Sequence, residues 1–155
     1  MRIITLIISL FFFSASTSAS ETREILDLYK NWVAAVEEGD IESYVSVLHE
    51  DVKLMPPTSE PFEGKEKYKA FLEPVFQSAD YEIEVKVEPS VEFLGDVAIA
   101  EYEYVIDLKL KEGQSEIDQP GALQATRNHN AYFDVLIRNS KGKWVVYRHT
   151  WRDKS

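Results

Sequence analysis

Apolar and polar residues alternate along the C-terminal half of the chain in a way that predicts a long antiparallel sheet. Residues 81–88 alternate without a fault, and residues 97–110 form the longest predicted strand. Pro89 interrupts the first pattern, which predicts a bulge or an edge strand at that point. The apolar face of the second strand is expected to face a core and holds Ala98, Ala100, Tyr102, Tyr104, Ile106 and Leu108.

The last stretch, residues 127–152, is predicted to be a hairpin with a four-residue turn at Asn139-Ser140-Lys141-Gly142. An even-numbered loop places opposite residues of the two strands on the same face. The inner face is then predicted to hold His129, Ala131, Phe133, Val135, Ile137, Trp144, Val146, Arg148 and Thr150. The outer face is predicted to hold Asn130, Tyr132, Asp134, Leu136, Arg138, Lys143, Val145, Tyr147, His149 and Trp151.

The pattern of apolar residues in the N-terminal half of the chain predicts helices. Apolar residues spaced by three and four indicate a first helix from about Glu21 to Glu38. Gly39 is placed to end this helix, and Asp40 is placed to cap a short second helix. A third helix is predicted for residues 65–73, where Pro74 would end it.

The first 19 residues have the pattern of a secretory signal. A basic start at Arg2 precedes an apolar run, Ile3 to Phe13, that is too short to span a bilayer, and small polar residues follow it. We therefore expect residues 1–19 to be removed and residues 20–155 to form one secreted or periplasmic domain. The open alternative is an uncleaved N-terminal anchor. The sequence has no cysteine, so neither a lipid-modified cysteine nor a disulfide is possible.

The net charge of the chain and the absence of several known motifs argue against some classes of function. The formal net charge of −10 disfavours nucleic acid as a partner, and we expect no membrane contact once the signal is removed. No phosphate-binding glycine loop, nucleophile elbow or dinucleotide fingerprint is present. Three scattered histidines without cysteine argue against a metal site, so no cofactor is expected.

Several short motifs resemble the nuclear transport factor 2-like superfamily, which includes ketosteroid-isomerase-like and polyketide-cyclase-like proteins. The motifs are Trp32 before Glu38-Gly39-Asp40, the stretch 61–65, Gly95-Asp96-Val97-Ala98 before Tyr104, and the stretch 142–146 before His149 and Trp151. The resemblance implies an α+β fold with a curved antiparallel sheet wrapped as a cone around N-terminal helices. It also implies a pocket at the open end and, often, a homodimer.

Two candidate functional residues lie on the predicted inner face. Arg148 is the candidate anchor for a ligand carboxylate, because a guanidinium can bind a carboxylate with two hydrogen bonds. Its alternative is a structural ion pair or a position at the rim. His129 is the candidate catalytic acid or base, and its alternative is a histidine with only structural hydrogen bonds.

The candidate pocket wall is aromatic. The side chains expected to contact a ligand are Trp32, Tyr44, Tyr102, Tyr104 and Phe133. They can equally be core residues. A ketosteroid-isomerase-type mechanism would also need a carboxylate base in the pocket. The sequence does not place one, because Glu101, Glu103, Asp107 and Asp134 are all predicted to point to the outer face.

The predicted outer face would expose three aromatic residues and a histidine, Tyr132, Tyr147, Trp151 and His149, rimmed by Glu101 and Glu103. Such a patch favours a homodimer. The loop Lys111 to Ala125 is expected to cover the pocket, with Gly113 and Gly121 allowing it to move. We therefore expect a small-ligand-binding domain with a partly apolar pocket, suited to a carboxylate-bearing ligand. The alternatives are a cofactor-free isomerase, dehydratase or hydrolase that transfers a proton, and a non-catalytic dimerisation module.

Overall fold

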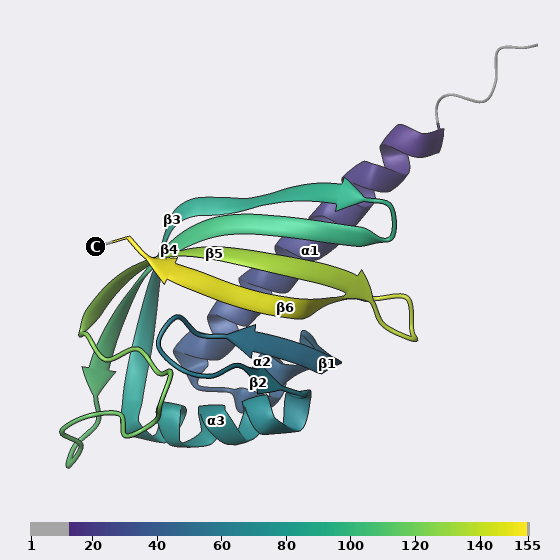
Figure 1. The fold of residues 1–155 in the computed structure, drawn as a ribbon. Helices are drawn as coiled ribbons and strands as arrows, with labels where there is room; N and C mark the ends of the chain where they lie inside the picture. Colours follow the sequence, from purple (N-terminus) through teal and green to yellow (C-terminus); the bar gives the residue numbers. More distant parts are fainter. Residues whose placement is uncertain (1–12, 155) are drawn as a thin grey trace, which may run out of the picture.

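The computed structural model describes residues 13–154 and has an α+β fold (Figure 1). The elements are α1 (Phe13–Glu38), α2 (Ile41–Ser46), β1 (Leu48–Met55), β2 (Phe62–Glu63), α3 (Lys65–Ser78), β3 (Ala79–Leu94), β4 (Val97–Leu110), β5 (Arg127–Arg138) and β6 (Trp144–Asp153). The strands form one sheet in the order β2-β1-β6-β5-β4-β3. Only β1 and β6 pair in parallel. The predicted fold class is confirmed.

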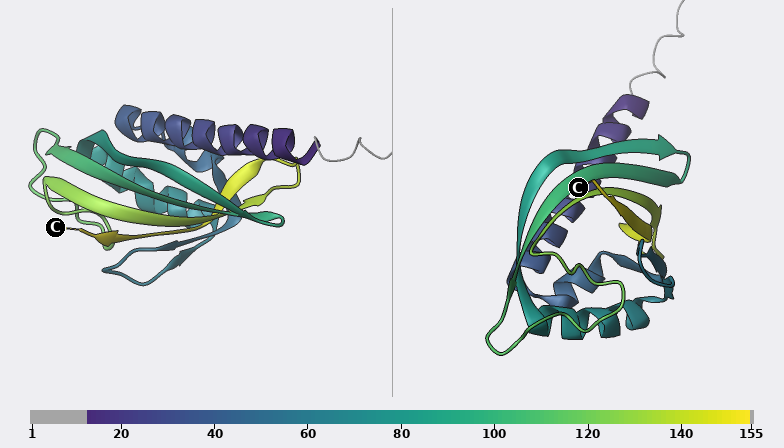
Figure 2. Two further views of the ribbon diagram at one scale, coloured as in Figure 1. Left: turned by 90° about the horizontal axis from the view of Figure 1, so that it is seen from above. Right: turned by 60° about the vertical axis from the view of Figure 1, so that its left-hand side comes forward.

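The sheet curves around the helices (Figure 2). Helix α1 lies along one face of the sheet, and α3 crosses its wide end (Figures 1 and 2). Most of the predicted secretory signal, residues 1–12, lies outside the described residues, and residues 13–19 form the start of α1. No helix in the described part of the chain is long and apolar enough to cross a membrane.

The predicted boundary between α1 and α2 is confirmed. Gly39 has a φ of 65°, the left-handed conformation that commonly ends a helix. Asp40 then caps α2 by accepting hydrogen bonds from the Ser43 backbone N–H at 3.1 Å and from the Ser43 hydroxyl at 2.6 Å. These hydrogen bonds lower the pKa of Asp40 below its ordinary value.

The prediction that Pro74 ends the third helix is wrong. Helix α3 continues through Pro74 to Ser78, although proline cannot donate a backbone hydrogen bond to the preceding turn. Val75 and Phe76, which follow the proline, are both buried in the core. The burial of these two side chains offsets the lost hydrogen bond, so the last turn stays helical.

Strands β3 and β4 match the sequence pattern. Strand β3 is at the sheet edge, and its register with β4 shifts between Val85 and Val87 and again between Val87 and Ser90. Pro89 lies within the second irregularity, as predicted. The apolar face of β4 is buried, from Ala98 at 0% exposed to Ile106 at 8%.

The predicted faces of β5 are inverted. The hairpin loop has five residues, 139–143, so Arg138 pairs with Trp144 and not with Lys143. The Asn139 side chain favours the longer loop because its oxygen accepts from the backbone N–H groups of Lys141 at 2.9 Å and Lys143 at 3.1 Å. A shift of one residue in a strand moves every side chain to the opposite face. The even-numbered residues of β5 therefore point inward.

A β-bulge in β6 adds a second change of face. Val135 pairs with Arg148 and Leu136 pairs with Val146, so Tyr147 is an extra residue without a partner on β5. Before the bulge, Trp144 and Val146 are buried, as predicted. Beyond it, the alternation restarts one residue later. His149 is therefore buried and Arg148 is on the outer face, the reverse of the prediction.

Candidate functional site

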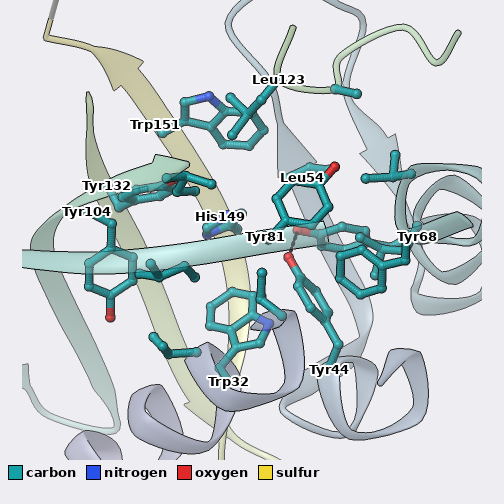
Figure 3. A pocket seen from close by; sticks show the side chains of 18 of the residues that line it. Trp32, Tyr44, Leu54, Tyr68, Tyr81, Tyr104, Leu123, Tyr132, His149 and Trp151 are labelled. Atoms are coloured by element: carbon teal, nitrogen blue, oxygen red, sulfur yellow. Dashed lines mark hydrogen bonds between the residues drawn. The ribbon is translucent and has the colours of Figure 1, made fainter. Parts of the chain in front are cut away.

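A cavity of about 120 Å³ lies between the helices and the concave face of the sheet (Figure 3). The helices contribute Tyr29, Trp32, Tyr44 and Tyr68 to its wall. The strands contribute Tyr81, Tyr102, Tyr104, Tyr132, His149 and Trp151. A cavity needs roughly 10–15 Å³ to hold one water, so this one has room for a small multi-atom ligand.

The most deeply buried polar group beside the cavity is Asp134, whose side chain is 0% exposed. Its Oδ1 lies 2.7 Å from His149 Nδ1. Its Oδ2 accepts hydrogen bonds from the Tyr29 hydroxyl at 2.8 Å and from the Tyr102 hydroxyl at 2.9 Å. Three donors from α1, β4 and β6 thus converge on one carboxylate of β5, which fits the rule that a buried charge needs hydrogen-bond partners.

Within the Asp134–His149 pair, His149 is the side chain that reaches the cavity. It is 5% exposed and lines the cavity. When Nδ1–H donates its hydrogen bond to Asp134 Oδ1, the lone pair of the neutral imidazole is on Nε2. Nε2 makes no hydrogen bond to any other described residue. It is therefore the ring nitrogen that is available to a ligand.

Aromatic rings hold the imidazole from several sides. The Tyr132 ring is nearly parallel to the His149 ring, with a centroid distance of 5.6 Å and an interplanar angle of 17°. Trp32 and Trp151 lie against the imidazole at centroid distances of 5.0 Å and 5.5 Å. These contacts, together with the hydrogen bond to Asp134, fix the orientation of His149.

The phenols of the cavity stay protonated. Burial is the largest cause that raises the pKa values of Tyr29 and Tyr102 well above their ordinary value, and the neighbouring Asp134 raises both further. Burial likewise raises the pKa values of Tyr44 and Tyr68, whose hydroxyls lie 2.7 Å apart. These groups act as neutral hydrogen-bonding partners.

The lining is apolar apart from the phenols, the imidazole and the indole N–H groups. No Lys, Arg, Asp or Glu of residues 13–154 lines the cavity. The same part of the chain contains no cluster of three His, Asp or Glu residues that could hold a metal ion. The chemistry that the described groups can perform is proton transfer by His149 and hydrogen bonding by the phenols.

Four of the predicted pocket residues line the cavity: Trp32, Tyr44, Tyr102 and Tyr104. Whether they contact a ligand stays a prediction. Phe133 does not line the cavity and is 41% exposed, because the five-residue loop turns it to the outer face. The predicted place of Phe133 on the inner face is therefore wrong.

The predicted positions of Arg148 and His129 are also wrong. The Arg148 guanidinium stacks on the Tyr147 ring, 3.6 Å from its centroid, and donates to the Tyr147 carbonyl at 2.7 Å. His129 lies 3.1 Å from Glu103, on the outer face. The bulge moves Arg148 outward, and the loop length moves His129 outward.

The outer aromatic patch predicted for a homodimer does not exist in that form. Tyr132 and His149 are buried, at 9% and 5% exposed, and Trp151 lines the cavity. Of the four predicted residues, only Tyr147 is outside the cavity. The same error explains why the sequence assigned Asp134 to the outer face and missed its link to His149. A signal was present in Asn139, which favours the longer loop.

The loop between β4 and β5 lies over the cavity, as predicted, and Gly121, Ala122 and Leu123 form part of the lining. Whether Gly121 acts as a hinge stays a prediction, and its packing gives a separate reason for glycine at this position. A Cβ atom added there would lie 2.6 Å from Ser59 Oγ and 3.3 Å from Pro56 Cγ, and its φ is 89°. Glycine is thus required by close packing against the segment after β1.

The fold is shared with solved structures of low sequence identity. A proposed scytalone dehydratase from Novosphingobium aromaticivorans has a TM-score of 0.73 and 14% identity, over 91% of this chain and 89% of that chain. A nuclear transport factor 2-like superfamily protein from Salmonella enterica has a TM-score of 0.73 and 10% identity, over 89% and 94%. A ketosteroid isomerase-like protein from Erwinia carotovora has a TM-score of 0.67 and 19% identity, over 87% and 97%.

The sequence comparison gives the family. No curated protein matches the sequence with significance. The model of the SnoaL-like domain matches residues 29–147, which include the C-terminal part of α1, all elements from α2 to β5 and the start of β6. The chain belongs to the SnoaL-like domain family, within the nuclear transport factor 2-like superfamily.

Proposed function

We propose that this domain binds a small, neutral, largely apolar molecule in its cavity and transfers a proton on that molecule through His149. The observation that supports the proposal is the position of His149, with Nδ1 bound to a buried carboxylate and Nε2 free in an apolar cavity. A cofactor-free isomerase or dehydratase reaction fits this arrangement. SnoaL-like domains are small-ligand-binding or isomerase- and dehydratase-type domains, which agrees with either outcome.

The proposed step begins with His149 Nε2 as the base. Nε2 takes a proton from a carbon beside a ligand carbonyl, so a C–H bond breaks, an N–H bond forms and the carbonyl becomes an enolate. Asp134 stabilises the resulting imidazolium and keeps the ring in the productive orientation, as carboxylates do in other His–Asp pairs. The same N–H then returns the proton to the carbon or to a different position of the ligand.

The cavity favours a neutral ligand over the carboxylate-bearing one that the sequence suggested. That suggestion depended on Arg148, which lies on the outer face and stacks on Tyr147. A carboxylate in the cavity would lose its hydration without gaining a cation among the described lining residues. A carbonyl or hydroxyl group loses far less on entering such a site.

Proton transfer can be tested without the natural substrate, using 2-indanone in D₂O. The ketone has acidic C–H groups, and NMR follows their exchange for deuterium. We expect the protein to accelerate exchange, and we expect His149→Gln to lose about 10²-fold or more of this rate, the usual share of a general base. His129→Gln is the matched control, because His129 lies outside the cavity and its loss should leave the rate unchanged.

The alternative is a binding domain without catalysis. In that case 2-indanone would bind to the wild-type protein, but exchange would proceed at the same rate in wild type and His149→Gln. The buried network around Asp134 would then serve to shape the cavity. Equal rates in the two proteins would therefore contradict the proposed catalytic role while leaving ligand binding in place.

We also propose that the domain is secreted or periplasmic. The N-terminal sequence supports this, because a basic start and a short apolar run precede small residues ending at Ala19. N-terminal sequencing of the protein purified from its own host should begin near Ser20. An intact Met1 in the exported or cytoplasmic fraction would contradict the proposed cleavage.

A further inference from the structure

One phenol of the cavity wall has a fully buried hydroxyl without a hydrogen-bond partner in the described residues. Tyr81 on β3 is 8% exposed, and its hydroxyl oxygen is fully buried without a partner in the described residues. Tyr81 also lines the cavity that contains His149 (Figure 3). Buried polar groups in folded proteins are nearly always paired, so an unpaired hydroxyl beside a cavity points to a missing partner.

The surroundings of Tyr81 support this view. Burial is the cause that raises its pKa, in agreement with the missing hydrogen bond to its hydroxyl among the described residues. Tyr29, Tyr44, Tyr68 and Tyr102 differ, because each has a hydrogen bond to another side chain. Tyr81 is therefore the unsatisfied phenol among these cavity residues.

The Trp32 indole N–H is the other buried lining group without a hydrogen bond of good geometry. The Trp32 N–H is weaker evidence for a ligand contact than the Tyr81 hydroxyl is. The Trp32 ring lies 5.2 Å from the Tyr44 ring, and interaction with Trp32 lowers the pKa of Tyr44. The indole N–H thus interacts with the Tyr44 hydroxyl, whereas no hydrogen bond to the Tyr81 hydroxyl is found in the described residues.

Tyr81 and His149 lie at different ends of a row of ring contacts. Tyr81 contacts Phe76, Phe76 contacts Tyr44, Tyr44 contacts Trp32, and Trp32 contacts His149, with centroid distances of 5.0 to 5.9 Å. Both strands that carry the two polar groups, β3 and β6, are separated in the sheet by β4 and β5. The wall between the two polar groups is aromatic.

We propose that the cavity recognises a neutral ring compound with two polar groups, one that meets His149 Nε2 and a second that bonds to the Tyr81 hydroxyl. This inference rests on the proposed function of the same site and adds a specificity-determining residue to it. The ring of the ligand lies against the aromatic wall. One polar group of the ligand binds His149 Nε2, and the other binds the Tyr81 hydroxyl. Tyr81 contributes binding and takes no part in the proton transfer.

The test compares 2-indanone with 5-hydroxy-2-indanone, which carries a second polar group opposite the ketone. One added neutral hydrogen bond should make the wild-type protein bind the hydroxylated ketone about five-fold more tightly. Tyr81→Phe should remove this preference and leave the affinity for 2-indanone unchanged. For 5-hydroxy-2-indanone, the substitution should raise KM. It should leave kcat, the rate of exchange at saturating ketone, unchanged.

Tyr68→Phe is the matched control, because it removes a lining hydroxyl that is already paired with Tyr44. It should keep the ligand preference but lower the unfolding midpoint, whereas Tyr81→Phe should keep or raise the midpoint. Three results would overturn the inference: equal affinities of the wild type for the two ketones, a preference that survives in Tyr81→Phe, or a midpoint that falls as far in Tyr81→Phe as in Tyr68→Phe.

The two proposals can fail separately. In one outcome, Tyr81→Phe abolishes the preference while His149→Gln leaves the exchange rate unchanged. This result would support the contact with Tyr81 and reject the catalytic role of His149. A preference that survives in Tyr81→Phe, with exchange that depends on His149, removes the second contact and keeps the catalytic base. Failure of both ketones to bind at millimolar concentration overturns the assigned ligand class.

Discussion

Asp134 is a residue whose burial needs three partners at once. A carboxylate transferred from water into an apolar interior is costly unless its oxygens accept strong hydrogen bonds. The hydroxyls of Tyr29 and Tyr102 and the imidazole of His149 supply these bonds. Each of the three donors is thereby fixed by the same carboxylate. The orientation of the catalytic candidate and the integrity of the core thus depend on one side chain.

Replacing Asp134 with Asn should lower the free energy of unfolding by about 3 kcal/mol, because the amide cannot accept all three donors and leaves one unpaired. Chemical denaturation measures this change. Glu103→Gln is the control, since Glu103 also bonds to a histidine but lies at the surface, and it should change stability little. Similar small losses in both variants would mean that the buried network is not required for stability.

At the scale of elements, alternation predicted the buried face of β4 because a long regular strand keeps its period. The boundary at Gly39 and Asp40 was predictable because capping depends on neighbours in the sequence. The faces of β5 and the far end of β6 were not, since a five-residue loop and a bulge at Tyr147 each shift the period by one. The candidate site was missed for the same reason: Asp134 and His149 lie beyond these two irregularities.

The inverted face of β5 can be tested with two truncations on the same strand. Leu136→Ala should cost about 2–5 kcal/mol, because Leu136 is 0% exposed. Phe133→Ala should cost less than about 1 kcal/mol in the monomer, because Phe133 is 41% exposed. Urea unfolding of both variants measures the difference. A larger loss for Phe133 than for Leu136 would restore the face predicted from the four-residue turn.

The cap of α2 should respond to acid. Hydrogen bonds from Ser43 lower the pKa of Asp40 in the folded protein, so this residue stabilises the fold above its ordinary pKa. The contribution is lost as the pH falls through the lowered value. Asp40→Asn keeps a capping side chain without a titrating group. The stability difference between wild type and Asp40→Asn should therefore shrink below about pH 4, the ordinary range for Asp, and a constant difference down to pH 2 would contradict the assignment.

At the scale of the whole molecule, the sheet leaves an exposed apolar surface on its convex side. The large hydrophobic side chains exposed there include Phe133 at 41% and Val87 at 47%, which pairs with the outer-face residue Glu103. Val135 lies beside Phe133 on β5 and is half-buried. A surface of this kind favours association, so the prediction of a homodimer is kept with different contact residues.

We expect the domain to sediment as a dimer at tens of micromolar and Phe133→Glu to produce monomers. The reason is that a charge in the centre of an apolar contact loses its hydration without a partner. Glu101→Gln, on the exposed side of β4, is a control for a change of charge alone and should leave the dimer intact. A wild-type protein that is monomeric at this concentration would contradict the prediction.

The contact of Gly121 with Pro56 and Ser59 bears on how fast a ligand exchanges. Because this contact packs the loop against the segment after β1, we expect the loop to stay in place when a ligand enters the cavity. The ligand would then need only a movement of side chains at the entrance. Leu123 and Trp151, which also line the cavity, are only partly buried and can change rotamer. Rotamer changes of such side chains are faster than the collective opening of a lid. We therefore expect short residence times for weakly bound ligands, which a protein isolated by lengthy chromatography would lose.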